Sequence, residues 1–229
     1  MSVNSQYKPE YKIILQCLLI QQMSPYTLLQ NILETESDGE YTDLDKAIRI
    51  INETICVFLQ KIVILPCELT GEKMCVLVST AERPELKCNL TPIQSEYLYE
   101  LVHAIITSEN GFIGSIDALN LSSDLEGGKV SRSVADEYLR LFVEKKLLLM
   151  KEGMYFLSAL SIAELGPFIS ENFDIDNCHL CKQMVICGEK CLNCDTLLHK
   201  HCFSQFRESF KKKVKCPNCK NEWGVVAND

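Results

Sequence analysis

Four closely spaced pairs of cysteine and histidine residues follow one another near the C-terminus and constrain the fold more than any other feature. Three are Cys-x-x-Cys pairs and one is a His-x-x-Cys pair. Two ligands three positions apart can bind one tetrahedral zinc ion from a single turn, and each structural zinc needs four ligands. The pattern therefore predicts two zinc ions. The eight candidate ligands are Cys178, Cys181, Cys191, Cys194, His199, Cys202, Cys216 and Cys219.

A disulfide-rich lobe and a set of buried free thiols are the two alternatives to zinc. The first ten residues are polar and contain no apolar core of a secretory signal. The sequence also contains no run approaching the roughly 20 apolar residues of a membrane span. We therefore expect the thirteen cysteines to be reduced and the protein to be intracellular, which favours zinc.

Two residues inside the pattern are expected not to bind metal. His201 is adjacent to Cys202, and neighbouring residues seldom turn toward the same ion, whereas His199 can reach the ion from one turn. Cys187 has no partner at metal-binding spacing, so we interpret it as a small apolar residue beneath a loop.

The charge of the chain is unevenly distributed. The net charge is −8. The residues from Asn172 onward include nine Lys and Arg and seven Asp and Glu. The preceding part is therefore strongly acidic, which makes the chain alone a weak binder of DNA. The basic run from Lys211 to Lys215 could be a nuclear-import signal, a DNA contact or a patch facing a partner enzyme, although a solvated loop between zinc ligands explains it better than any one of these functions.

Residues 1–86 show the element order of a winged-helix domain. Apolar residues at helical spacing predict a helix around Tyr11 to Leu19, and Ser24 followed by Pro25 predicts the N-cap and first position of a second helix. An apolar stripe from Leu44 to Leu59 predicts a third helix with Phe58 and Leu59 on its inner face. Two β-branched runs, Ile62 to Leu65 and Cys75 to Val78, then predict a hairpin.

The same order recurs in residues 87–171. Thr91 and Gln94 form a capping box before a helix, a short helix follows at Ile116 to Leu121, and a third helix is predicted from Ser131 to Lys146. Glu152 and Gly153 predict a hairpin turn. The predicted fold is thus α+β: two tandem winged-helix domains (1–86 and 87–171) followed by a small zinc-binding domain (172–229).

The order of the ligands resembles the RING superfamily and its relatives, including PHD fingers. The whole chain resembles the family of first non-SMC elements of the structural-maintenance-of-chromosomes five/six complex. The residues that carry this resemblance are Ser108 to Phe112, Leu119 to Leu121, Lys151 to Gly153, and the lobe from Cys178 to Trp223. The resemblance implies an interleaved cross-brace, in which the first and third ligand pairs bind one zinc and the second and fourth pairs bind the other.

The resemblance also implies a function. It predicts a nuclear subunit that pairs with a MAGE-type winged-helix protein and a kleisin subunit, takes part in recombinational DNA repair, and acts as a RING-type E3 ubiquitin ligase. Such a ligase holds an E2 enzyme charged with ubiquitin in a reactive geometry and supplies no nucleophile of its own. We therefore expect no catalytic residue on this chain.

The resemblance places the E2-facing surface at Leu180, the loop from Gln183 to Ile186, and Pro217. Lys220 follows the last ligand, where strong RING ligases often carry an arginine that bridges E2 and ubiquitin. Lysine lacks the planar fork for bidentate contacts, so we expect weak activity from the protein alone.

Two non-catalytic functions remain as alternatives. A single histidine in fifth place is typical of PHD fingers, but Val214 stands where such fingers usually carry tryptophan. Phe203, Phe206 and Phe210 could contribute to an aromatic cage for methyl-lysine, although their spacing is more typical of one helix face. The second non-catalytic alternative is that the zinc domain is only a docking surface.

Overall fold

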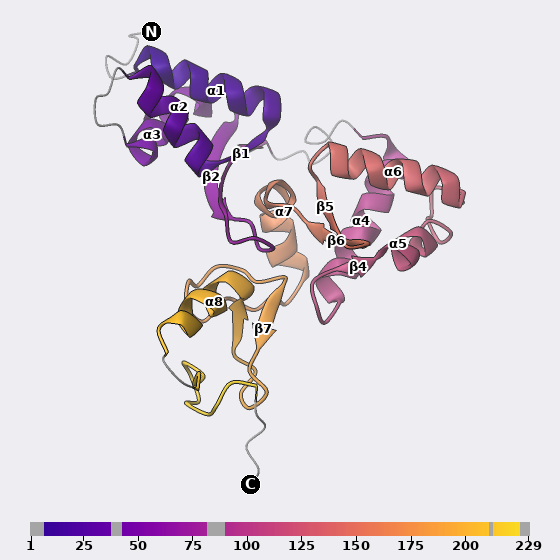
Figure 1. Cartoon of the computed structure of the whole chain (residues 1–229). Coiled ribbons are helices and arrows are strands. Elements are labelled where there is room, and N and C mark those ends of the chain that lie inside the picture. The colour runs from indigo at the N-terminus through magenta and orange to yellow at the C-terminus, as the bar shows by residue number, and fades with distance from the viewer. Residues whose placement is uncertain (1–6, 38–42, 82–89, 211–212, 225–229) are drawn as a thin grey trace. The chain divides into compact units, whose positions relative to one another are not determined.

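The computed structural model describes residues 7–37, 43–81, 90–210 and 213–224, which form two compact units (Figure 1). Unit 1 comprises residues 1–67, 72–91 and 158–166. Unit 2 comprises residues 68–71, 92–157 and 167–229. Unit 2 therefore includes the four residues Glu68–Gly71 from the turn that follows the second strand of the chain.

Within the described residues, unit 1 contains three complete helices, the first part of α7 (Ala159–Asn172) and a three-stranded antiparallel sheet. In chain order the elements are α1 (Pro9–Gln21), β1 (Met23–Pro25), α2 (Tyr26–Glu36), α3 (Leu44–Ile55), the 3-10 turn η1 (Cys56–Phe58), β2 (Gln60–Pro66) and β3 (Lys73–Ser79). The strand order is β1-β3-β2, with Ile62 opposite Leu77 and Ser24 opposite Cys75. One apolar face of each helix packs into a shared core that includes Ile14, Leu29 and Ile51.

The start of α2 differs from the prediction. Ser24 lies in strand β1 and Pro25 is the residue before the helix, so the helix begins at Tyr26 without a side-chain cap. Ser24 is buried, and its hydroxyl has no hydrogen-bond partner within the described part of the chain. The prediction failed because the pairing of Ser24 with Cys75 in the sheet is a contact between distant residues, and a local Ser-Pro signal cannot reveal it.

The end of α3 is the second correction. Phe58 and Leu59 were expected to face inward at the end of a long helix, but α3 ends at Ile55 and both side chains are exposed. Leu59 adopts a left-handed backbone conformation (φ 55°), which ends the helical path and turns the chain into β2. The periodicity of apolar residues continued past the point at which the backbone leaves the helix.

The first part of unit 2 repeats this order of elements. It contains α4 (Pro92–Thr107), β4 (Ile113–Gly114), α5 (Ser115–Leu121), α6 (Arg132–Glu144), β5 (Leu148–Lys151) and β6 (Met154–Leu157). The strand order β4-β6-β5 corresponds to β1-β3-β2 of unit 1. Helix α4 begins directly after the predicted cap Thr91, and Ser131 caps α6 by accepting a hydrogen bond from the Val134 N–H.

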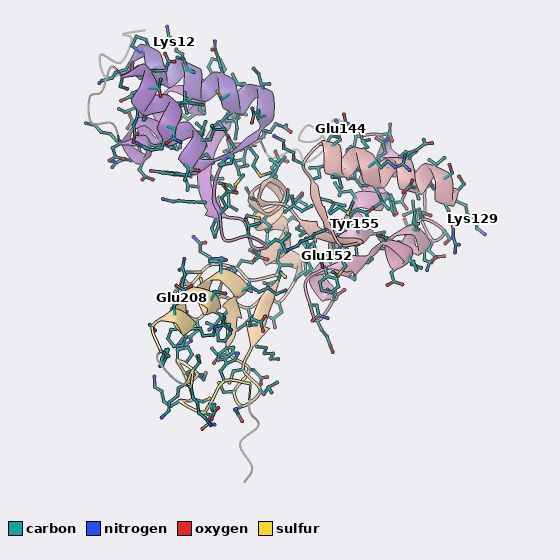
Figure 2. All side chains as sticks on the ribbon, in the orientation of Figure 1. Lys12, Lys129, Glu144, Glu152, Tyr155 and Glu208 are labelled. Atoms are coloured by element: carbon teal, nitrogen blue, oxygen red, sulfur yellow. The ribbon has the colours of Figure 1, made fainter. Side chains whose placement is uncertain are left out.

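The core of this part is built around Tyr97. Its ring lies 6.0 Å from that of Phe142, and its hydroxyl donates to the carbonyl of Ala118 at 2.7 Å. Burial raises the pKa of Tyr97 well above its usual value because the phenolate would lose its hydration, so the phenol stays protonated and can donate this bond. Figure 2 labels Glu152, in the turn between β5 and β6, and Tyr155, in strand β6.

The chain continues through α7 (Ala159–Asn172) into the zinc lobe, by which we mean residues 177–210 and 213–224. The zinc lobe contains β7 (Gly188–Lys190), β8 (Leu197–His199) and α8 (Lys200–Glu208). Figure 1 shows α8 beside β7, and exposed Glu208 is labelled at the end of α8 in Figure 2. The prediction of a mixed helical and sheet chain with a C-terminal RING-like domain is confirmed, while the domain boundaries at 86/87 and 171/172 stay predictions.

Among the residues that the structure describes, none of the helices combines the length and the apolar character needed to span a membrane.

Candidate metal centre

The three Cys-x-x-Cys pairs form three hairpins of the same backbone geometry. In each, the N–H of the first cysteine donates to the carbonyl five residues later, at 2.8 Å for Cys178, 2.9 Å for Cys191 and 2.8 Å for Cys216. The residue after each second cysteine is left-handed: Lys182, Asp195 and Lys220 have φ of 62°, 55° and 67°. This repeated turn points both cysteines of a pair toward one centre.

The structure brings the eight predicted ligands together in two groups. Within each group all ligand atoms lie within 4.8 Å of one another. The first group consists of Cys178, Cys181, His199 and Cys202, and the second of Cys191, Cys194, Cys216 and Cys219. The first and third pairs along the chain thus form one group and the second and fourth form the other, which is the interleaved arrangement that the resemblance implied.

The distances within the groups suit zinc. Nδ1 of His199 lies 3.3 Å from Sγ of Cys181 and 3.8 Å from Sγ of Cys202. In the second group, Sγ of Cys194 and Cys216 are 3.6 Å apart. A tetrahedral zinc with Zn–S bonds of about 2.3 Å holds its ligand atoms roughly 3.5–4 Å apart. The two groups therefore fit two zinc ions, one with three sulfurs and a nitrogen and one with four sulfurs.

Hydrogen bonds at Cys194, in the second group, favour the thiolate form that binds metal. The Thr196 hydroxyl lies 3.0 Å from Sγ of Cys194 and, with the Thr196 backbone, lowers the pKa of that thiol to about 6. Asn218 donates to Thr196 Oγ1 at 3.1 Å. These polar neighbours stabilise negative charge on sulfur before a metal arrives.

His201 and Cys187 lie outside both groups, as expected. The His201 ring stacks on that of His199 with centroids 4.9 Å apart, and its Nδ1 has no hydrogen-bond partner within the described residues. Cys187 is buried, and burial raises the pKa of its thiol, so it remains protonated and inert.

The residues predicted to face an E2 enzyme differ in exposure. Leu180 is exposed and Ile186 and Pro217 are half-buried. Lys220 is exposed, and its ammonium donates to the Pro217 carbonyl at 2.6 Å. In the predicted basic run, Lys211 and Lys212 lie outside the described residues, and Lys213 forms an ion pair with Glu222 at 2.8 Å.

The aromatic residues of the zinc lobe pack against one another. Phe203 stacks on Trp223 with ring centroids 4.9 Å apart, and both pack on the small core of Cys178, Val185 and Leu198. Phe206 contacts Phe210 at the same centroid distance. Phe203 therefore packs on the core, as a helix face would, whereas Phe210 lies beyond the end of α8, so the three aromatic residues do not form one helix face.

Glu68 is the residue near the metal centre that sequence reasoning missed. It is buried within unit 2, and its carboxylate lies beside His199 and accepts hydrogen bonds from the loop after the first Cys-x-x-Cys pair. A lone glutamate between two apolar strands resembles any solvated turn residue. No local pattern marks it, because its partners lie more than a hundred residues away.

Comparisons with known proteins agree with this geometry. A family model described as a RING-like domain matches residues 178–219. The human non-structural maintenance of chromosomes element 1 homologue is 28% identical over 150 residues, which are 65% of this chain and 56% of that protein. The Drosophila melanogaster homologue is 25% identical over 195 residues, 83% of this chain and 82% of that protein. The chain thus spans little more than half the length of the mammalian relatives that it matches.

A solved structure shares the fold over nearly the whole chain. A chain from a structure titled "Nse1-Nse3-Nse4 complex" superposes with a TM-score of 0.83 at 23% identity, covering 97% of this chain and all of that one. In sequence this chain is thus similar to the non-structural maintenance of chromosomes element 1 proteins, and it shares its fold with a chain of the Nse1-Nse3-Nse4 complex.

Proposed function

We propose that this protein is a nuclear subunit of the structural-maintenance-of-chromosomes five/six complex, that it acts in recombinational DNA repair, and that it binds a MAGE-type winged-helix subunit and a kleisin. The observation that carries this proposal is the homology to element 1 proteins together with the fold shared with a chain of the Nse1-Nse3-Nse4 complex. The shared fold covers 97% of this chain and so includes the repeated helix-and-strand units as well as the zinc lobe.

An exposed apolar patch in unit 1 supports a protein partner. The η1 patch consists of Val57, Phe58 and Leu59, whose exposed fractions are 74%, 73% and 55%. Three consecutive large apolar side chains in water are costly, and clusters of this kind typically mark a protein-binding surface. The acidic character of the body makes nucleic acid an unfavourable partner for the same surface.

The partner proposal is tested by co-purification with a MAGE-type subunit. We expect a complex that survives moderate salt, because burial of apolar area outweighs screened charge. Phe58→Asp should weaken binding at least about tenfold, as truncation of a central apolar contact typically does. Ile116→Asp, which changes an exposed isoleucine in unit 2, is the matched control. A complex that dissociates at slightly raised salt, or that never forms, contradicts the proposal.

For the zinc lobe we propose RING-type E3 ubiquitin transferase activity. The zinc ions would hold the three hairpins in one arrangement, and the first hairpin then presents exposed Leu180 to an E2 enzyme. The chain would accelerate transfer by ordering the E2–ubiquitin thioester, with no nucleophile of its own. The Lys220 ammonium donates to the Pro217 carbonyl, and lysine lacks the planar fork needed for bidentate contacts with E2 and ubiquitin. The isolated protein should therefore be a weak ligase that its MAGE partner stimulates.

Ubiquitin transfer in vitro, across a panel of E2 enzymes with and without the MAGE partner, tests this activity. Leu180→Ala should reduce transfer about tenfold or more without loss of zinc. Leu192→Ala, at an exposed leucine of the second hairpin, should leave transfer unchanged. Lys220→Arg should raise basal transfer. If the partner-bound protein transfers no ubiquitin with any E2 and both site variants are silent, the zinc lobe is a docking module and the ligase proposal is abandoned.

A further inference from the structure

The carboxylate of Glu68 is buried in unit 2, where only 6% of the residue is exposed. Oε1 accepts a hydrogen bond from the Ile186 N–H at 2.9 Å, and Oε2 accepts one from the Cys187 N–H at 2.8 Å. Burying a carboxylate is costly unless several donors replace its water, and two main-chain N–H groups meet part of that need. These two donors belong to the loop that follows the first Cys-x-x-Cys hairpin.

The same carboxylate faces a predicted zinc ligand. Because Nδ1 of His199 points toward Cys181 and Cys202, Nδ1 is the atom placed to bind metal and Nε2 carries the proton. Nε2 lies 2.8 Å from the Met184 carbonyl and 3.3 Å from Oε1 of Glu68. The ring N–H therefore lies near two acceptors. One is the Glu68 carboxylate itself, and the other is the Met184 carbonyl, in the loop whose N–H groups Glu68 binds.

A close approach on the other side keeps the loop in place. Gly111 is left-handed (φ 71°), and a Cβ atom at this position would lie 2.2 Å from the Ile186 carbonyl oxygen and 2.7 Å from Cα of Cys187. Gly71, in the same turn as Glu68, packs against the His201 ring in a similar way, with a Cβ there only 2.4 Å from Cβ of His201. The backbone of Ile186 and Cys187 thus approaches Gly111 closely and is also hydrogen-bonded to Glu68.

We propose that Glu68 is a positioning residue for the first metal group, which orients the His199 imidazole both directly and through the Met184–Cys187 backbone. Partners of this kind fix the tautomer and orientation of a ligating histidine and make it a better donor to the metal. Zinc retention in the zinc lobe therefore depends on a residue 119 positions before Cys187 in the sequence. The inference concerns the metal centre and stands whether or not the protein transfers ubiquitin.

The test compares Glu68→Gln with Glu109→Gln in the full-length chain. Glutamine keeps the size of the side chain but has only one acceptor oxygen. Its N–H₂ group, itself a donor, would face a main-chain N–H group of Ile186 or Cys187 that now donates to the carboxylate. Glu109 is exposed, lies two residues before Gly111, and undergoes the same change of charge. In competition with a chromogenic chelator, Glu68→Gln should bind one of its two zinc ions 10- to 100-fold more weakly, the usual effect of losing such a partner. Glu109→Gln should match the unmodified protein.

Cadmium substitution identifies which site is affected. The two groups should give separate ¹¹³Cd resonances, because one has a nitrogen ligand and the other has only sulfur ligands. In Glu68→Gln only the resonance of the site containing His199 should shift and broaden, and Glu68→Asp, which keeps the charge, should restore part of the affinity. Unchanged chelator competition would overturn the proposal. Equal weakening of both cadmium signals would also overturn it, because Glu68 would then support the zinc lobe as a whole.

Discussion

His199 and His201 are two residues apart but have different roles. His199 is 1% exposed and directs Nδ1 toward two cysteine sulfurs, whereas the His201 ring stacks on its outer side. Residues adjacent in a chain seldom reach the same point, so spacing correctly selected the histidine three positions before Cys202. The preference was predictable because it depends only on the geometry of one turn.

We therefore predict that His199→Ala removes one zinc and His201→Ala removes none. The first variant leaves three ligands for a metal that needs four. The second loses a stacked ring, which should cost about 1 kcal/mol of stability as aromatic pairs usually do. Metal analysis of fresh, reduced protein gives the result directly. A loss of zinc from His201→Ala would show that the ligand has been misassigned.

At the scale of elements, the zinc lobe consists of short hairpins that have few contacts of their own. Its hydrophobic core cluster consists of three buried residues, Cys178, Val185 and Leu198, with four partly buried residues packed on them, and several of its other buried residues are predicted metal ligands. The backbone of Ile186 and Cys187 also lies close to Gly111, within the turn Ser108 to Phe112. The resemblance pointed to this turn through its sequence, and the structure supplies the reason: only glycine permits so close an approach.

Gly111→Ala should therefore destabilise the protein more than Gly153→Ala. Both glycines are left-handed, with φ of 71° and 77°, so each substitution costs about 1 kcal/mol in backbone energy. At Gly153 the nearest atom to a new Cβ is 3.8 Å away, whereas at Gly111 the loop backbone must move, which should add roughly 1–3 kcal/mol. Urea unfolding of the zinc-loaded protein measures the difference, and equal effects would contradict the close approach of Gly111 to the loop.

On the scale of the whole molecule, the described parts depend on different sources of stability. The helical part of unit 1 buries an extensive apolar core, while the zinc lobe depends on its metal ions. Chelation should therefore unfold the zinc lobe and leave most of the helical circular dichroism intact, because small metal domains unfold without their ions. Tryptophan fluorescence reports on this directly, since Trp223 lies in the zinc lobe and is the sole tryptophan of the sequence. Cooperative loss of all helical signal on chelation would contradict this division.

The sequence by itself determined the features that depend on local spacing. These are the eight ligands, the exclusion of His201 and Cys187, the repeated order of helices and strands, and the resemblance to element 1 proteins. Each rests on residues that are close in the chain, where turn geometry and periodicity act directly. The pairing of ligands into interleaved groups required knowledge of the RING family, because spacing alone also allows two sequential sites.

Only the tertiary structure decided the features that depend on distant contacts. Ser24 is a strand residue because Cys75 lies opposite it, and Phe58 is exposed because the backbone turns at Leu59. Glu68 reaches the metal centre because the chain brings the β2–β3 turn to a loop 119 residues further on. The physical reason is the same in each case: the energy of a contact between distant segments depends on the fold, and no short window of sequence contains both partners.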